Sequence, residues 1–428
     1  MFKVLVIAYY YPPMGLSGVQ RTLKFTKYMS HYNWEPTVIT AGSTGYYAHD
    51  NSLMKEAEKA EIRIVRTESS DINSRLAKYG TIEMPNEKIR KFLSRVSKTF
   101  LIPDNKVDWA NRAYKKAEEL LQNEKFDVIF VSIPPFSAFR MATRLKAKFK
   151  LPLIVDYRDL WYGNHFAFYP TPYHKIRHKK LEESALRAAD HIIAVNRNVK
   201  EQLITTYKFL KFEDVTILPH GFDPADFEGV KRVNDKSLKR KIKILYSGIF
   251  YENVTPKYFL KAFKKLTIDE PQIAENFELH FVGLFRRENE RHVKNWNLHR
   301  FIHIHGYLNH EDVIQKLVDS DILWVMLGNG KNMNMVSSGK IFEYFGSRKP
   351  ILVCAPDGAT RSAAKEYGAS YIVDPEDIEG MKQKLIEIYK QFVKNELPIP
   401  GEDFILKHDR NFLTKQLTQQ FQFYIRED

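Results

Sequence analysis

Short apolar runs rich in β-branched residues alternate along the chain with longer segments whose apolar residues recur at helical spacing. This alternation is typical of parallel sheets with helices on both faces, and so many strands rarely share one open sheet. We therefore predict an α/β protein with two Rossmann-like, doubly wound domains. The expected strands are 3–8, 36–40, 62–65, 127–132, 153–156, 192–195, 215–218, 242–247, 278–282, 302–305, 322–326, 351–354 and 370–373. The expected helices are 19–31, 108–124, 138–149, 173–189, 197–207, 256–266, 310–320, 339–348, 359–367 and 376–394.

A turn at 220–224, followed by a polar and basic stretch, marks the predicted domain boundary. After it, the chain repeats the order of strand, loop containing Gly or Pro, and helix with which it begins. The predicted parts are a first domain over 1–222, a linker over 223–241, a second domain over 242–408 and a last helix over 409–428 that packs back on the first domain.

The composition narrows the class of protein. The chain has 428 residues, of which 44% are hydrophobic, and one cysteine, Cys354, so a disulfide framework and a multi-cysteine metal site are excluded. No apolar run reaches the ~20 residues of a membrane-spanning helix, and the N-terminal apolar run is too short for a signal peptide. We therefore predict a cytoplasmic protein.

The net charge is +14, and the basic residues gather mainly in the first half, at 88–98, 144–150 and 174–180, with a further group at 231–243. This charge favours an anionic partner, which could be a small substrate, a membrane surface or nucleic acid. No segment resembles a nucleic-acid-binding motif, so we predict no nucleic-acid partner.

Ligands of open parallel sheets bind beyond the carboxyl ends of the strands. After the first strand, Gly15 and Gly18 would let the backbone approach a phosphate at a helix N-terminus, although a turn explains them about equally well. The spacing is not that of the dinucleotide-binding glycine motif, and 40–43 lacks the acidic residue that such a site needs. A nicotinamide or flavin dehydrogenase is therefore disfavoured.

In the second half, Ser338 and Gly339 are predicted to begin a helix whose N–H groups, together with Lys340, would bind an anion. Glu343 lies on the same side of this helix, where its carboxylate could contact ribose hydroxyls. The alternative, an ordinary capped helix with an ion pair between Lys340 and Glu343, explains the spacing about as well.

Asp156, Arg158 and Asp159 stand at the end of a predicted strand, where they must be solvated in a cleft or paired. Pairing of Arg158 with a neighbouring carboxylate is one interpretation, and an acceptor-side or catalytic group is the other.

His280, His303 and His305 alternate within predicted strands, at a spacing that a metal site could use. Histidines in strands are more often packed and hydrogen-bonded, and no carboxylate motif joins these three. We predict no metal.

Eight segments together resemble the family 4 glycosyltransferases of the GT-B class, which retain the configuration of the transferred sugar. The resemblance implies two Rossmann-like domains facing across a cleft, with the nucleotide on the second domain, the acceptor on the first, and neither cofactor nor metal. The segments are 12–18, 153–161, 189–195, 218–223, 246–248, 281–283, 305–308 and 338–350, the last being the most specific.

The resemblance also implies roles for single residues. Glu343 would contact the ribose, whereas Met335 stands where the family's motif has its first glutamate. Lys340 would neutralise the diphosphate in place of the usual Arg and Lys after Gly248, with Lys257 or Arg286 as the remoter alternatives. The implied donor-binding residues are Gly15, Gly18, Gly248, Gly283, Tyr307, Leu308, Ser338, Gly339, Lys340, Ile341 and Glu343. The implied catalytic residues are Asp159 and Lys340, and the acceptor-side residues are Asp156, Arg158 and Trp161.

These observations predict a retaining glycosyltransferase that moves a sugar from a nucleotide-sugar donor to a glycan or lipid-linked acceptor in surface polysaccharide or glycolipid biosynthesis. The basic first half suits docking on the anionic inner face of the cytoplasmic membrane. The alternatives are a nucleotide-sugar epimerase of the same architecture, using Asp156 and Asp159 as acid and base, and a degenerate non-catalytic homologue.

Overall fold

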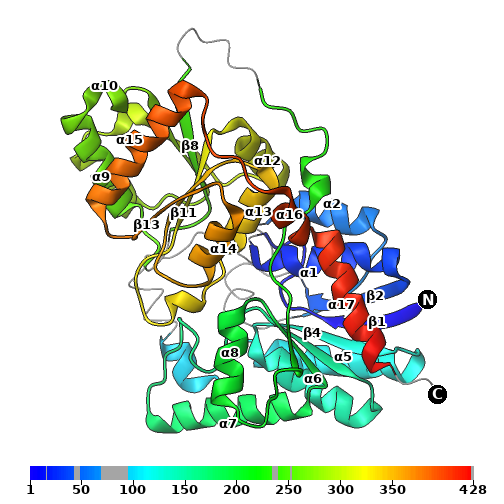
Figure 1. Ribbon diagram of the computed structural model, residues 1–428. Helices are drawn as coiled ribbons and strands as arrows, with labels where there is room; N and C mark the ends of the chain where they lie inside the picture. The colour runs from blue at the N-terminus through cyan, green and yellow to red at the C-terminus, as the bar shows by residue number, and fades with distance from the viewer. Residues whose placement is uncertain (16, 43–48, 69–94, 234–239, 251–252, 426–428) are drawn as a thin grey trace. The chain divides into compact units, whose positions relative to one another are not determined.

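The computed structural model describes residues 1–15, 17–42, 49–68, 95–233, 240–250 and 253–425. The chain folds as two compact units, Met1–His220 with Arg410–Asp428, and Gly221–Asp409 (Figure 1). Part of the basic groups predicted to face an anionic partner, at 88–94 and 234–239, lies outside the described residues. Within the described part of the chain, no helix has the length and apolarity needed to cross a membrane.

The first unit is built on a seven-stranded parallel sheet of order β3-β2-β1-β4-β5-β6-β7. All six residues of β4 are buried, which explains why the central strands are continuous apolar runs. The strands are β1 (Phe2–Ile7), β2 (Trp34–Ala41), β3 (Arg63–Thr67), β4 (Val128–Ile133), β5 (Leu153–Tyr157), β6 (His191–Ala194) and β7 (Val215–Ile217).

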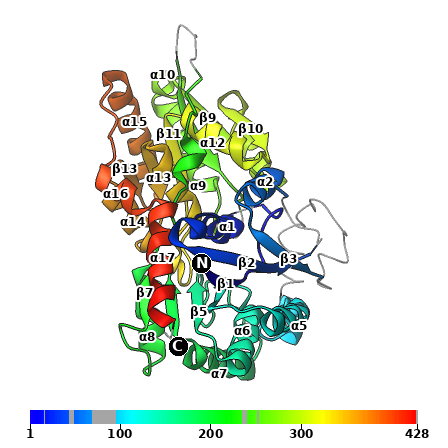
Figure 2. The same cartoon turned by 90° about the vertical axis from the view of Figure 1, so that its right-hand side faces the viewer.

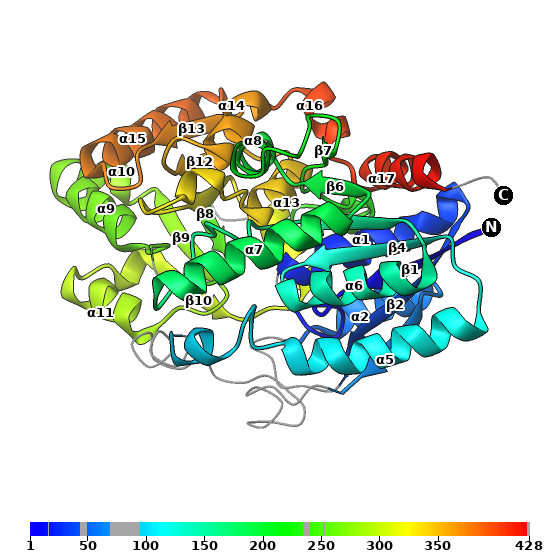
Figure 3. The ribbon, with the colours of Figure 1, turned by 90° about the horizontal axis from the view of Figure 1, so that it is seen from below.

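Helices cover both faces of this sheet. α5 and α6 lie side by side on one face, and α1 and α17 lie together on the other, as Figure 2 and Figure 3 show. The helix α17, from the end of the chain, therefore belongs to the first unit. The helices are α1 (Ser17–Met29), α2 (Asn51–Lys59), α5 (Val107–Asn123), α6 (Phe136–Phe149), α7 (Pro172–Ala188), α8 (Arg197–Thr206) and α17 (Arg410–Tyr424).

The second unit has a six-stranded parallel sheet of order β10-β9-β8-β11-β12-β13. In its helical layers, α9 contacts α11 and α15, and α13 contacts α12 and α14. The strands are β8 (Ile242–Ser247), β9 (Phe277–Val282), β10 (Ile302–Gly306), β11 (Ile322–Met326), β12 (Ile351–Cys354) and β13 (Ser370–Val373). The helices are α9 (Lys257–Asp269), α10 (Pro271–Ala274), α11 (Arg287–Asn295), α12 (His310–Asp319), α13 (Gly339–Ser347), α14 (Ala359–Tyr367), α15 (Ile378–Lys394) and α16 (Glu402–Lys407).

The predicted fold class, two doubly wound α/β units, is confirmed, and every predicted strand is present. Among the helices named above, α2, α10, α11 and α16 were not predicted, because they are short or strongly polar. The start of the predicted linker is not a free connection: a Cβ on Gly346 would meet the Phe222 and Phe227 rings at 2.6 Å, so this stretch packs on α13.

In each sheet the strand order reverses at one place, between β1 and β4 in the first unit and between β8 and β11 in the second. Open α/β sheets bind ligands beyond the carboxyl ends of the strands at this place. The loops after β1 and β4, and after β8 and β11, are therefore where a site is expected.

Candidate functional site

Three glycines follow the carboxyl ends of β8, β9 and β10 and bring the loops of the second unit together. Gly248, Gly283 and Gly306 have positive φ angles of 137°, 108° and 71°. The N–H of Gly283 donates to the carbonyl of Gly306 at 2.6 Å. A Cβ on Gly283 would come within 2.2 Å of the carbonyl oxygen of Gly248, so only glycine permits this contact. Gly248 and Gly283, both predicted to bind the donor, thus shape one surface.

The N-terminus of α13 faces this surface. Ser338 occupies the N-cap position, but its side chain makes no capping hydrogen bond, contrary to an ordinary capped helix. Instead, its backbone N–H donates to the Thr360 hydroxyl at 3.2 Å, and that hydroxyl donates to the Val336 carbonyl at 2.9 Å. First-turn N–H groups of a helix lack acceptors within the helix and carry its partial positive charge. They remain suited to an anionic ligand.

Lys340 projects from the first turn of α13 toward β8. Its Nζ donates to the Tyr246 hydroxyl at 2.9 Å and lies 4.6 Å from the centre of that ring. Burial lowers the pKa of Lys340 to about 8, against a smaller opposing effect from Glu343. The predicted ion pair between Lys340 and Glu343 is not formed, and among the described residues Lys340 Nζ makes no hydrogen bond to a carboxylate; Glu343 acts on it only through its charge at longer range.

Gly248 makes the position of Lys340 possible. A Cβ there would lie 2.1 Å from Lys340 Cε and 2.4 Å from Nζ. A second tie fixes the helix to the same strand, because the N–H of Ser247 donates to the Tyr344 hydroxyl at 2.9 Å. Tyr246, which the sequence analysis included in the segment 246–248 but gave no role, is thus the direct partner of the predicted catalytic lysine.

The remaining donor-side residues are placed differently. The Ile341 side chain is fully buried, so only its backbone can reach a ligand. Tyr307 is 36% exposed just after β10, whereas Leu308 packs partly against the core. Glu343 is half-buried on α13, and Met335 is half-buried at the end of a short 3-10 turn, Met333–Met335.

In the first unit, the Asp156 side chain at the end of β5 is wholly buried and so is Arg21 on α1. The Arg21 guanidinium donates to both carboxylate oxygens at 2.8–3.0 Å, and the Ser132 hydroxyl donates to one of them at 2.9 Å. Arg21 also donates to the carbonyls of Leu218 and Pro219. Contact between Asp156 and an acceptor, as predicted, is incompatible with this burial. The residue instead holds α1, β4 and β5 together, and its partner Arg21 was missed.

Arg158 also differs from its predicted pairing with a neighbouring carboxylate. Its guanidinium donates to the carbonyls of Gly18 at the start of α1, Ile133 at the end of β4 and Pro134 just after β4. A Cβ on Gly18 would meet Arg158 at 3.3 Å. Arg158 therefore holds the start of α1 against the end of β4, where the strand order reverses. Gly15, predicted with Gly18 to face the diphosphate, is buried.

Asp159 and Trp161 follow β5 but have different surroundings. Trp161 is buried, donates to His178 Nδ1 at 2.9 Å and stacks on Phe136 at 5.1 Å, so its predicted contact with an acceptor would require the ring to leave this packing. Asp159 is half-buried and, among the described residues, has no hydrogen-bond or ion-pair partner. Of the predicted acceptor-side and catalytic carboxylates, only Asp159 is available to a ligand.

The chain thus has two doubly wound α/β units, and the second unit has a helix N-terminus beside Lys340 that is suited to an anion. Models of two protein families match the chain, Glycosyltransferase Family 4 over residues 82–226 and Glycosyl transferases group 1 over residues 241–391. Between them they cover more than half of its length. The chain belongs to this glycosyltransferase family and is an enzyme of the GT-B type, as predicted.

Solved structures share the fold over essentially the whole chain at low identity. A glycosyltransferase from Rickettsia africae superposes with a TM-score of 0.67 at 15% identity, covering 100% of this chain and 99% of that one. Anabaena HepE in complex with UDP and glucose superposes with 0.65 at 12%, covering 99% and 100%. A UDP-N-acetylglucosamine 2-epimerase, so described, from Listeria monocytogenes superposes with 0.59 at 13%, covering 100% and 98%. No curated protein sequence matches the chain.

Proposed function

We propose that the protein is a retaining glycosyltransferase that transfers a sugar from a nucleotide-sugar donor to a glycan or lipid-linked acceptor. The observation that supports this most directly is Lys340, a half-buried lysine whose ammonium is held at a helix N-terminus by the Tyr246 hydroxyl. A cation that makes no hydrogen bond to a carboxylate in such a place favours binding of a dianionic group.

The chemistry of sugar transfer needs such a group. When the bond from the sugar to the diphosphate breaks, negative charge builds up on the leaving phosphate. The Lys340 ammonium and the N–H groups of Gly339 and Lys340 would stabilise that charge in place. Glu343, one turn further on the same side of α13, would accept hydrogen bonds from the ribose hydroxyls. HepE, which shares this fold, is described in complex with UDP, and a uridine nucleotide is our first choice of donor.

Asp159 is the carboxylate we propose on the acceptor side, because it is half-buried without a partner among the described residues. We propose that the basic groups of the first unit, including 144–150 and 174–180, attract an anionic membrane that carries the acceptor. The expected workplace is the cytoplasmic side of that membrane, in surface polysaccharide or glycolipid synthesis.

The first test is thermal stabilisation of the purified chain by a panel of nucleoside diphosphates and nucleotide sugars, because a ligand of the native state raises its melting temperature. We expect one nucleotide series to shift the wild type and to lose at least tenfold in affinity with Glu343→Gln. Lys390→Met, an exposed lysine on α15, is the control and should bind like the wild type. If no nucleotide shifts the wild type, the chain is a non-catalytic homologue.

The epimerase alternative rests on the fold that the chain shares with the Listeria protein. It is weakened by the burial of Asp156 against Arg21, which removes one of its two acid–base groups. Incubation of the bound nucleotide sugar without acceptor separates the two activities: a second nucleotide sugar as product favours the epimerase. Proton NMR of a transferase product would show whether the anomeric configuration is retained.

A further inference from the structure

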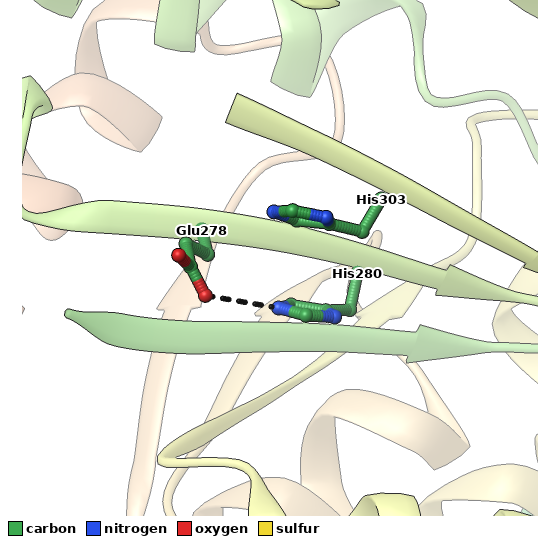
Figure 4. A group of neighbouring side chains, drawn as sticks. All are labelled: Glu278, His280 and His303. Atoms are coloured by element: carbon green, nitrogen blue, oxygen red, sulfur yellow. Dashed lines mark ion pairs between the residues drawn. The ribbon is translucent and has the colours of Figure 1, made fainter. Parts of the chain in front are cut away.

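A group of ionisable side chains outside the donor site lies on the outer two strands of the second sheet. Glu278 and His280 are two residues apart on β9 and so point to the same face, and the strand register places His303 of β10 opposite His280. Figure 4 shows the three side chains gathered beside one another. One ligand atom from each lies within 4.8 Å of the other two. We call these three residues the β9–β10 cluster.

One ring nitrogen of His280 contacts His305, and the other faces Glu278. His280 Nδ1 lies 2.9 Å from His305 Nε2. The opposite nitrogen, His280 Nε2, is buried, has no hydrogen-bond partner among the described residues and lies 3.5 Å from a Glu278 carboxylate oxygen.

The 2.9 Å contact between His280 Nδ1 and His305 Nε2 allows two proton arrangements. If His280 Nδ1–H donates to His305, the lone pair of Nε2 points at the Glu278 carboxylate, and two electron-rich atoms face each other with nothing between them. Metal-binding histidines are typically fixed in this way, with the second ring nitrogen donating to a neighbour. In the other arrangement, His305 donates and the Nε2–H of His280 lies at a long 3.5 Å from the carboxylate.

We propose that Glu278, His280 and His303 bind one divalent transition-metal ion of the zinc type, with a remaining position open to water. Zinc takes imidazole nitrogen and carboxylate oxygen at roughly 2.0–2.2 Å, which separates two tetrahedral ligands by about 3.4 Å. The 3.5 Å between His280 Nε2 and Glu278 Oε2 matches that separation. The exposed His303 ring completes the set by turning about its side-chain bonds.

This proposal revises the prediction of no metal. That prediction counted the histidines but not Glu278, which is the carboxylate that joins them. The surroundings also set the affinity: Lys243 on β8 and Lys316 on α12 add positive charge near His280, so we expect micromolar rather than tighter binding. A bound ion would tie the edge strand β10 to β9.

The test uses the full chain without a histidine tag, stripped of metal with a chelator and dialysed. Titration with ZnCl₂ followed by calorimetry should show one ion per chain. Co²⁺ at the same site should give the visible absorption of a low-coordinate nitrogen and oxygen environment. Glu278→Gln and His303→Ala should each weaken Zn²⁺ binding at least tenfold, and His305→Ala about tenfold through the loss of its hold on His280.

His299→Ala is the matched control, because His299 is an exposed histidine of the same unit outside the cluster, and it should bind like the wild type. His303 is exposed, so His303→Ala should leave the melting temperature of the metal-free chain unchanged, which separates lost binding from lost folding. Absence of Zn²⁺ binding by the wild type overturns the proposal. So does equal binding by His303→Ala and the wild type, which would place the ion elsewhere.

Discussion

Each unit has a cation near the end of a strand, buried Arg21 beside β5 in the first unit and half-buried Lys340 beside β8 in the second, yet the two cations have different partners. Arg21 donates to both oxygens of the buried Asp156 carboxylate and to two backbone carbonyls. Lys340 contacts only the neutral hydroxyl and ring of Tyr246. The first cation is neutralised within the protein, whereas the second keeps a charge that an anionic ligand can use.

The difference separates groups that maintain the fold from groups that bind. A buried ion pair whose partner is removed leaves an uncompensated charge and strongly destabilises the protein. A lysine that is desolvated without an ion-pair partner is itself unfavourable for folding, and the lowered pKa of Lys340 reflects this. Removal of the positive charge should therefore destabilise the fold at Arg21 but not at Lys340.

The largest effect is expected for Arg21→Met, which leaves Asp156 buried without its cation and should destabilise the first unit by about 3–5 kcal/mol. Denaturant unfolding followed by fluorescence measures it. Lys27→Met on the same helix should cost below about 1 kcal/mol, because Lys27 is partly exposed and Lys24 still pairs with Glu56. If Arg21→Met lowers the free energy of unfolding by less than about 1 kcal/mol, the Arg21–Asp156 pair does not maintain the fold.

Lys340→Met should weaken nucleotide binding by roughly 10- to 100-fold, the loss expected for a charge-assisted hydrogen bond of about 1.5–3 kcal/mol. Its melting temperature should stay the same or rise, because the folded pKa of about 8 lies below that of an unfolded lysine. The charged form therefore disfavours folding at neutral pH, and this penalty fades as the pH rises above 8. Calorimetry measures the nucleotide affinity, and thermal unfolding the melting temperature, of the wild type and of Lys340→Met. A markedly lower melting temperature of Lys340→Met would mean that Lys340 stabilises the fold.

Nucleotide affinity should fall about tenfold between pH 7 and pH 9, as Lys340 loses its proton in the ligand-free protein around pH 8. The terminal phosphate of the ligand is already fully ionised over this range, because its pKa is about 6. Lys340→Met should bind weakly but with little change over the same range. A wild-type affinity that does not vary with pH would contradict the role of the ammonium.

The smallest effect is expected for Gly248→Ala, which should weaken nucleotide binding severalfold by displacing Lys340. Gly368→Ala is a matched control, because Gly368 also has a positive φ, 81°, but a Cβ there would meet no atom within 4 Å. Both should lower stability by about 1–2 kcal/mol through backbone strain. Equal nucleotide binding by the two variants would show that the Gly248–Lys340 contact is unimportant for the ligand.

The strands could be predicted because parallel strands buried on both faces are unbroken apolar runs, and β4 and β11 are buried throughout. Gly248, Gly283 and Lys340 could be proposed because they follow strands or begin a helix. The partners of these residues could not be predicted. Tyr246 is 94 positions from Lys340 and Asp156 is 135 from Arg21, so each pairing depends on how separate elements pack.

The β9–β10 cluster could be predicted only in part. The spacing of Glu278 and His280 is visible in the sequence, but the position of His303 opposite His280 follows from strand register, which the sequence pattern alone leaves open.

The return of α17 to the first unit has a consequence for synthesis of the chain. Phe421 is fully buried and its ring lies 5.1 Å from Trp34 and 5.3 Å from Phe130, on strands made early by the ribosome. Domains generally fold as they emerge, from the N-terminus onward. The apolar face over β2 and β4 is covered only once α17 has been synthesised, and α17 follows the whole second unit in the chain. The first unit is therefore translated first but completed after the second.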